Sequence, residues 1–356
     1  MTTSVTMKAS HFLMAFSLLT MLGSCKSDHK PAEPGQPDQS AERAADQGPT
    51  YAVTINGKRL LALPDPDTLV QVYQSELDQA RSHYLGNLKE VKAYADYGKK
   101  CLRLGYVENA LQVLSKGIDQ FPNTADLYFW RGVAGVQGRQ FQTAVNDLWK
   151  AGKAVEGQRG VKGITDRSED EVKIDASLPY LIYHWMGLAF QSQGDYSNAE
   201  KMYEISGDFS TNSDLYCRAY YWQYQAFRRA GRDADAASIL ESVSPDMYIS
   251  TSTRPYLDAL LYFKGKLGEK DLVDLDATPQ SSPEAASWTV RAYAVAVKAK
   301  LDNQEERYFK VLERIVATPF WNQPAYIAAE ADHHRIAGYD YQPMEETELI
   351  QGGRRK

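Results

Sequence analysis

Residues 91–122 read VKAYADYGKKCLRLGYVENALQVLSKGIDQFP, and much of this pattern returns 34 residues later in the chain. Positions that hold a large apolar residue in the first unit hold one again in the second, and positions that hold a small residue hold a small one again. The recurring pairs are Tyr94 and Tyr128, Gly98 and Gly132, Ala110 and Ala144, and Leu114 and Leu148. A fixed period of this length indicates a repeat architecture in which similar units stack on one another.

Each unit contains two stretches with helical apolar periodicity, separated by a short turn. The small residues Gly98 and Ala110 let two helices approach closely, so that Tyr94 and Leu114 can interlock. Neither helix can bury its apolar stripe alone, and neighbouring units must therefore stack. The pattern resembles the tetratricopeptide repeat (TPR), a helix-turn-helix unit of 34 residues.

Further units continue this resemblance along the chain. A third begins at Tyr180, a fourth near Cys217, a fifth surrounds Leu257 with a short second helix, and a sixth runs from Pro283. The resemblance implies an all-α, TPR-type α-solenoid of about five or six repeats over residues 91–338. Arg131 and Tyr224 depart from the pattern, because an apolar residue and a small residue are usual at those places.

The first 24 residues are predicted to be a signal peptide. The stretch from His11 to Leu22 is mostly apolar, follows Lys8, and is too short to span a bilayer. It ends in Leu22-Gly23-Ser24-Cys25, which resembles a bacterial lipobox. That resemblance implies cleavage before Cys25 and lipidation of its thiol, and Lys26 in the next position implies delivery to the outer membrane. The alternative is an ordinary secretory signal with an incidental cysteine.

The segments around the repeats have distinct compositions. Residues 25–50 are rich in proline, glycine and charge, which predicts a disordered tether. Residues 51–90 are expected to hold a β-hairpin, turning at Asn56-Gly57 and lying on the first helix, and a capping helix over 66–85. The polar stretch 156–176 is predicted to be a loop inserted between repeats two and three. Residues 324–336 form an expected last helix, and 339–356 a frayed tail.

The charge balance of the chain and the absence of certain motifs argue against several functional classes. The 356-residue chain has 40 basic and 46 acidic residues, so the strongly basic character of many nucleic-acid-binding domains is absent. Glycine-rich phosphate-binding motifs are missing, and nothing singles out a pair of carboxylates for glycoside hydrolysis. We therefore expect no catalytic residues, no cofactor and no nucleic-acid partner.

Two cysteines and one pair of acidic and histidine side chains are candidates for chemical reactivity or metal binding, and we expect a purely structural role for each. Cys101 falls on a core position, whereas Cys217 opens a helix and is expected to be partly exposed. Glu330 and His334 in the sequence AEADHH could share a helix face and hold a cation. We expect instead a solvated helix face without a metal, since no second ligand cluster accompanies them.

The concave groove of the solenoid is the predicted functional site. By the TPR resemblance, the first helix of each repeat lines this groove with basic and aromatic side chains, which suit a protein or peptide partner carrying carboxylates. These candidate groove residues are Lys92, Lys99, Arg103, Phe129, His184, Arg218, Tyr221, Gln225, Arg228 and Arg229.

The predicted function is that of a membrane-anchored TPR scaffold or adaptor in the bacterial cell envelope, on the periplasmic or the surface face. Two alternatives remain open. One is a glycan- or nutrient-binding surface lipoprotein, in which Tyr221 and Trp222 would stack on sugar rings. The other is an enzyme whose active site lies in the inserted loop 156–176.

Overall fold

The computed structural model describes residues 51–158, 160–161, 163, 174–336 and 338. All of them fall in one compact unit. The predicted signal peptide, tether and C-terminal tail lie outside the described residues, and so does most of the predicted insert 156–176.

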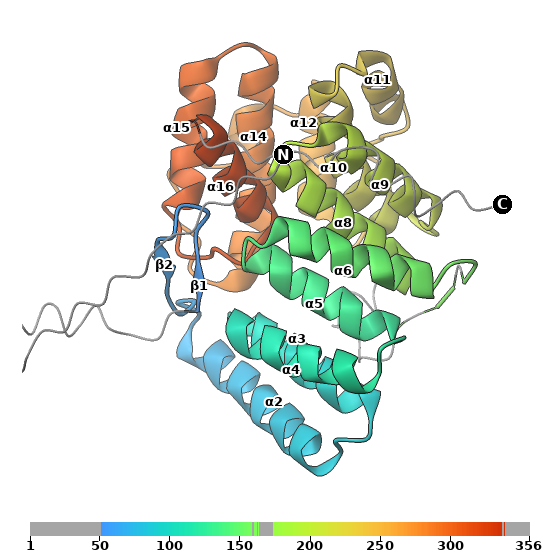
Figure 1. The fold of residues 1–356 in the computed structure, drawn as a ribbon. Coiled ribbons are helices and arrows are strands. Elements are labelled where there is room, and N and C mark those ends of the chain that lie inside the picture. Colours follow the sequence, from blue (N-terminus) through green and yellow to red (C-terminus); the bar gives the residue numbers. More distant parts are fainter. Residues whose placement is uncertain (1–50, 159, 162, 164–173, 337, 339–356) are drawn as a thin grey trace, which may run out of the picture. The chain divides into compact units, whose positions relative to one another are not determined.

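Fourteen helices and one two-stranded sheet make up the described part of the chain (Figure 1). The strands are β1 (Ala52–Val53) and β2 (Arg59–Leu60), which pair antiparallel with Ala52 opposite Leu60. The helices are α2 (Asp67–Gly86), α3 (Val91–Arg103), α4 (Val107–Gln120), α5 (Ala125–Gln137), α6 (Phe141–Ala154), α8 (Leu178–Gln193), α9 (Tyr196–Asp208), α10 (Ser213–Arg229), α11 (Asp233–Glu241), α12 (Arg254–Phe263), α13 (Glu269–Leu272), α14 (Ser282–Leu301), α15 (Glu305–Val316) and α16 (Pro324–Ile336).

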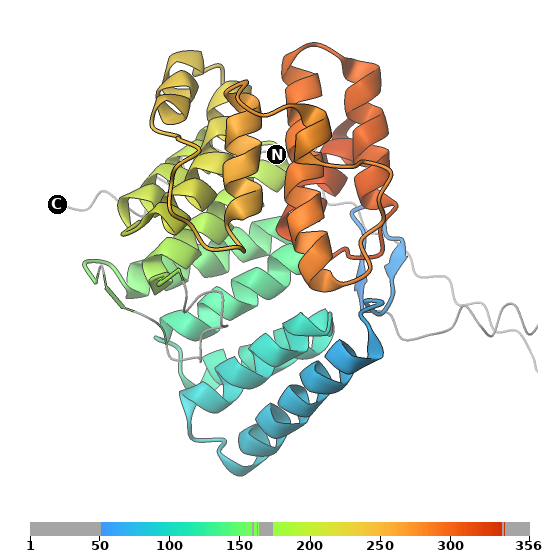
Figure 2. The ribbon, with the colours of Figure 1, turned by 180° about the vertical axis from the view of Figure 1, so that it is seen from behind.

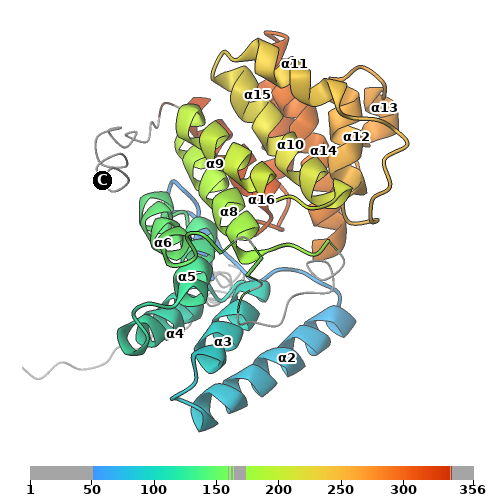
Figure 3. The same ribbon diagram turned by 90° about the vertical axis from the view of Figure 1, so that its right-hand side faces the viewer.

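From α3 to α15 the helices form six successive helix-turn-helix units (Figure 3). Each helix packs against the next one in the sequence, except that the short helix α13 is bypassed and α12 packs directly against α14. The fold is an all-α, TPR-type α-solenoid with a small N-terminal hairpin, as predicted. The close approach within a unit depends on small residues. A Cβ atom at Gly132 would lie 2.6 Å from Leu148, and one at Gly187 would lie 2.6 Å from the ring of Tyr203.

The two residues that depart from the repeat pattern have specific partners. Arg131 donates two hydrogen bonds of 2.7 Å to the Asp147 carboxylate and one of 3.2 Å to Ser115, so an ion pair replaces apolar packing there. Tyr224 stacks on Phe263 of α12 with ring centroids 4.5 Å apart. Its ring therefore packs between repeats four and five.

The turn inside each unit contains a residue with left-handed backbone conformation. Four of the six turns use glycine, with φ between 73° and 83°, whereas the turns of repeats two and six use Arg139 (φ 61°) and Asn303 (φ 59°). A left-handed conformation costs a side-chain-bearing residue on the order of 1–2 kcal/mol. Arg139 is therefore the unusual member of this series, because arginine lacks the short polar side chain with which asparagine tolerates the conformation.

Segments from the two ends of the described chain lie side by side. The Asp65 carboxylate accepts 2.6 Å hydrogen bonds from the amide and hydroxyl of Ser282 at the start of α14. The indole of Trp321, just before α16, donates to the Leu61 carbonyl at 2.8 Å. These contacts hold the segment before α2 against the sixth repeat and against the connection to α16.

The position of the hairpin differs from the sequence prediction. The strands do not lie on α2, the first helix. Tyr51 instead stacks on Tyr106, between α3 and α4, at 5.0 Å, and the amide of Ile55 donates to the Glu330 carboxylate of α16 at 3.0 Å. Burial against the last helix competes with burial against the first, and sequence periodicity does not distinguish the two.

None of the described helices is long and apolar enough to cross a bilayer.

Candidate partner-binding site

Three of the predicted groove residues lie at the surface of α3. Lys92 pairs with Asp96 one turn ahead, and the Lys99 ammonium lies 5.0 Å from the centre of the Trp130 ring. Arg103 donates a 2.9 Å hydrogen bond to Glu76 of α2 and is the most exposed of the three. We call Lys92, Lys99 and Arg103 the α3 basic strip.

Three of the predicted groove residues are buried in the structure, and a fourth, His184, is half-buried. Phe129 is 1% exposed, while Tyr221 and Gln225 have no exposed surface. The Tyr221 hydroxyl donates to the Val290 carbonyl of α14 at 2.8 Å, so repeat six covers repeat four. His184 stacks on Tyr180, and burial lowers its pKa to about 3, which leaves the imidazole neutral.

Arg218 and Arg228 are engaged with neighbouring helices. Arg218 donates 3.0 Å hydrogen bonds to Thr253 and Ser252, which precede α12. Arg228 pairs with Asp233 at the start of α11, with 2.8 Å between Nε and Oδ1. Arg228 thus connects the two helices of repeat four, and Arg218 connects repeat four to the start of repeat five.

Arg229 does bind a carboxylate, but that carboxylate belongs to the same chain. Its Nη1 and Nη2 donate to the two oxygens of Asp332 in α16 at 2.8 and 2.6 Å. The side chains are 8% and 1% exposed. Burial opposes both charges, yet the pair holds the pKa of Arg229 well above and that of Asp332 well below the ordinary values.

Tyrosines and a second arginine complete the surroundings of Asp332. The hydroxyl of Tyr293 donates to Asp332 at 2.8 Å, and Arg229 donates to the hydroxyl of Tyr196 at 2.6 Å. Arg335 also pairs with Asp332 and donates to the Ser192 carbonyl at 2.8 Å. These side chains come from α9, α10, α14 and α16, and the Ser192 carbonyl comes from α8, so the surroundings of one carboxylate connect repeats three, four and six.

Glu330, one helical turn before His334, forms a second buried ion pair. Arg139 donates to its Oε2 through Nε at 2.9 Å and donates to the Trp321 carbonyl at 3.0 Å. The Arg139 and Glu330 side chains are 3% and 9% exposed. This contact explains why arginine occupies the left-handed turn of repeat two, since its guanidinium reaches α16 from that turn.

The predicted solvated face of α16 is therefore wrong. Glu330, Asp332 and His334 are all buried. We call Arg139, Arg229, Tyr196, Tyr293 and the carboxylates of Glu330 and Asp332 the α16 cluster. Through it the solenoid holds the two carboxylates of α16 by a combination of arginines and tyrosines. Arg139, Glu330 and Asp332 were missed as site residues by sequence reasoning. A sequence signal for their burial was available. Alanines surround these acids in residues 325–331 and leave the helix without a polar face, which indicates a buried helix.

Both cysteines of the described unit are buried. Cys101 lies in the core as predicted, but Cys217, which was expected to be partly exposed, has no exposed surface. Burial raises the pKa of each thiol to about 12. Neither thiol is ionised near neutral pH, and neither has the properties of a nucleophile. Within the described residues, no three His, Cys, Asp or Glu side chains are grouped as metal ligands.

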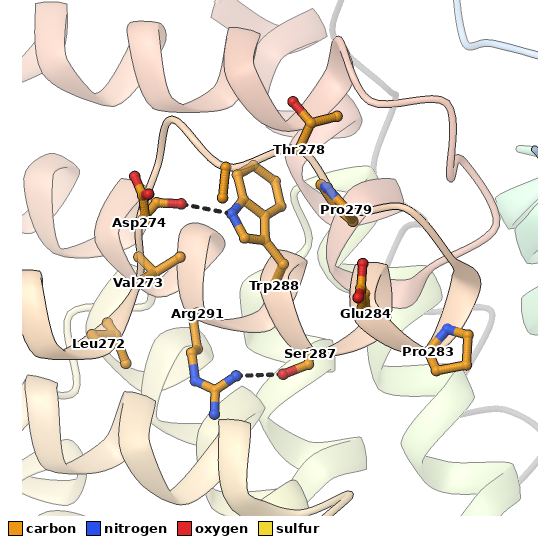
Figure 4. A pocket seen from close by; sticks show the side chains of 11 residues that line it. Leu272, Val273, Asp274, Thr278, Pro279, Pro283, Glu284, Ser287, Trp288 and Arg291 are labelled. Carbon is orange, nitrogen blue, oxygen red and sulfur yellow. Dashed lines mark hydrogen bonds between the residues drawn. The ribbon is translucent and has the colours of Figure 1, made fainter.

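A cavity of about 630 Å³ lies between the segment before α14 and the first turns of that helix (Figure 4). The indole of Trp288 donates to the Asp274 carbonyl at 2.9 Å across it. Arg291 is bound to Ser287 and to Asp258, and Glu284 accepts the amide of Gln280 at 2.7 Å. Its charged groups are thus engaged within the chain. The view from behind shows this segment along the outer side of α14 (Figure 2).

Comparisons with known proteins give only loose structural overlaps. No family model matches the chain, and no curated protein matches its sequence. Two crystal structures of MamA overlap with TM-scores of 0.36, at 18% and 16% identity, over 50% and 56% of this chain and 91% and 88% of theirs. The TPR domain of P58(IPK) overlaps 81% of this chain and 96% of its own, with 13% identity and a TM-score of 0.22. Because these TM-scores are low, the fold assignment rests on the helix-turn-helix repeats of the chain and not on the overlaps.

Proposed function

We propose that the chain is a lipid-anchored TPR-type scaffold of the bacterial cell envelope that binds a protein or peptide partner and has no enzymatic activity. The observation that carries this proposal is the α16 cluster. There the solenoid holds its own last helix through buried arginine–carboxylate pairs and tyrosine hydroxyls, and the same chemistry at an exposed site suits the carboxylates of a partner.

The α3 basic strip is the part of the predicted groove at which a partner's carboxylates can replace weak surface ion pairs, those of Lys92 with Asp96 and of Arg103 with Glu76. The Lys92 and Arg103 side chains are 38% and 44% exposed. Lys99 beside Trp130 combines a cation with an aromatic ring. This arrangement suits a carboxylate that lies next to an apolar group. The glycan alternative loses its proposed stacking pair, because Tyr221 and Trp222 are 0% and 1% exposed.

Partner capture from the envelope tests the scaffold role. We expect the protein to enrich a specific partner in a cross-linked pull-down read by mass spectrometry. Lys92→Glu with Lys99→Glu should reduce that enrichment at least about tenfold, since reversal of charges that face a partner's carboxylates replaces attraction by repulsion. The exposed pair Lys266→Glu and Lys270→Glu, with the same change of net charge, should leave it unchanged. Identical protein lists from all three would contradict the proposal.

Membrane fractionation tests the anchor. We expect the wild-type protein to stay in the membrane fraction through a high-salt wash and to be released by detergent, because buried acyl chains are insensitive to salt. The Cys25→Ser protein should appear in the soluble fraction after the same wash. Recovery of both proteins in the same fraction would argue against lipidation at Cys25.

A further inference from the structure

The β1–β2 hairpin presents basic and apolar side chains together. Lys58 is exposed just before its second strand and Arg59 at the start of that strand. Val53 is 42% exposed on the first strand, and Leu61 is 50% exposed just beyond the second. Val53 pairs directly with Arg59, so these two side chains share a face of the ribbon. The inward residue between Arg59 and Leu61 is Leu60, which is buried.

A cavity of about 390 Å³ lies beside this hairpin, between its second strand, the connection from α15 to α16, and α16 itself. Lys58, Arg59, Thr318, His333 and His334 contribute to its walls. The lining also includes Glu330. Its charge is compensated by Arg139, which lies 2.9 Å from its Oε2. The other charged side chains in its lining, Lys58 and Arg59, are basic, and its volume exceeds that of a phosphate group.

The occupant that fits this surface is an anionic lipid bilayer. Basic side chains interact with lipid phosphates, and the adjacent apolar side chains can enter the boundary between headgroups and acyl chains. The surface is also close to the proposed anchor along the chain. Only residues 26–50 separate Cys25 from Tyr51, and 25 residues reach at most about 90 Å. A weak surface contact becomes effective when a covalent link keeps it near its target.

We propose that the β1–β2 hairpin docks on the surface of the anionic membrane to which the chain is anchored. Lys58 and Arg59 contact lipid phosphates, Val53 and Leu61 contact the acyl boundary, and one phosphate enters the cavity beside His333. The proposal rests on the proposed membrane anchor for its setting. It assigns a function to the hairpin that the TPR scaffold does not require. In Figure 1 the hairpin lies at the edge of the solenoid beside α16.

The test uses the chain from residue 26 onward, which lacks the acyl group and keeps the whole compact unit. We expect it to sediment with vesicles of phosphatidylcholine containing about 30 mol % phosphatidylglycerol, and not with phosphatidylcholine alone. Each basic residue near an anionic surface contributes about fivefold to partitioning, so Lys58→Gln with Arg59→Gln should lower it about 25-fold. Lys266→Gln with Lys270→Gln is the matched control and should change it less than twofold. Val53→Ser with Leu61→Ser should also weaken binding.

Three results would overturn the proposal. The first is the absence of sedimentation with anionic vesicles, and the second is equal sedimentation of wild type and the Lys58/Arg59 variant. The third is saturable binding of inorganic phosphate that this variant abolishes, without any vesicle binding, since this would assign the cavity to a soluble anion. Because the tested chain has no acyl group, none of these results depends on whether Cys25 is lipidated.

Discussion

Asp332→Ala is expected to lower the free energy of unfolding by about 3–5 kcal/mol, because it leaves the Arg229 guanidinium buried without its carboxylate. Tyr293 would lose its acceptor at the same time. The measurement is urea denaturation of the soluble chain from residue 26, followed by circular dichroism. The control is Asp302→Ala. Asp302 pairs with Lys298 across 2.9 Å, but the two side chains are 44% and 37% exposed, and a loss of no more than about 1 kcal/mol is expected.

The same pair predicts how stability depends on pH. The pKa of Asp332 is lower in the folded than in the unfolded protein, so its stabilising contribution is complete above the unfolded value of about 4. That contribution is lost as the pH falls toward the folded value. The difference in stability between wild type and Asp332→Ala should therefore be constant above about pH 5 and shrink in acid. A difference that grew in acid would contradict the assignment of an ionised Asp332.

Gly187→Val is expected to destabilise the protein by about 3 kcal/mol, at the upper end of what overpacking costs. A Cβ atom at this position would lie 2.6 Å from the ring of Tyr203, which has no exposed surface. The ring cannot move aside, because His184 and Trp222 pack against it at 5.8 and 6.2 Å. Denaturant unfolding measures the effect, and a loss below about 1 kcal/mol would show that the two helices of repeat three do not approach so closely.

The matched control for this substitution is Gly207→Ala in the neighbouring helix α9. A Cβ atom at Gly207 would meet no other atom within 4 Å, and its φ is not positive. The helix propensity of alanine should then raise the stability by up to about 1 kcal/mol. Opposite signs at Gly187 and Gly207 would separate a packing requirement from a general effect of replacing glycine.

The repeats were predictable because their signals are local. Gly132 and Leu148 belong to one helix-turn-helix unit, and their contact depends only on a period that is visible in the sequence. The hairpin at Asn56-Gly57 was predicted on the same kind of evidence, and the paired strands confirm it. Local patterns of this kind fix each unit and its neighbour, which is most of what a solenoid requires.

The α16 cluster was not predictable from such patterns. Arg229 was expected to bind a carboxylate of a partner, but Asp332, 103 residues later, supplies one from the same chain. Arg139 and Glu330 are separated by 191 residues. Repeat periodicity describes how neighbouring units pack, and it contains no information on whether the last helix returns to the first repeats. Arg139 occupies a left-handed turn that four other repeats fill with glycine, but this second sign of the long-range contact is visible only in the structure.

The central claim is that α16 is bound by the solenoid through Arg229 and Asp332. A double-mutant cycle on this pair, with Arg229→Met, Asp332→Ala and the combined variant, tests it most directly. We expect a coupling free energy of at least about 2 kcal/mol, with the combined variant losing much less stability than the two single losses added together. Single losses that add to within about 0.5 kcal/mol would mean that the two residues do not touch, and α16 would have to lie elsewhere.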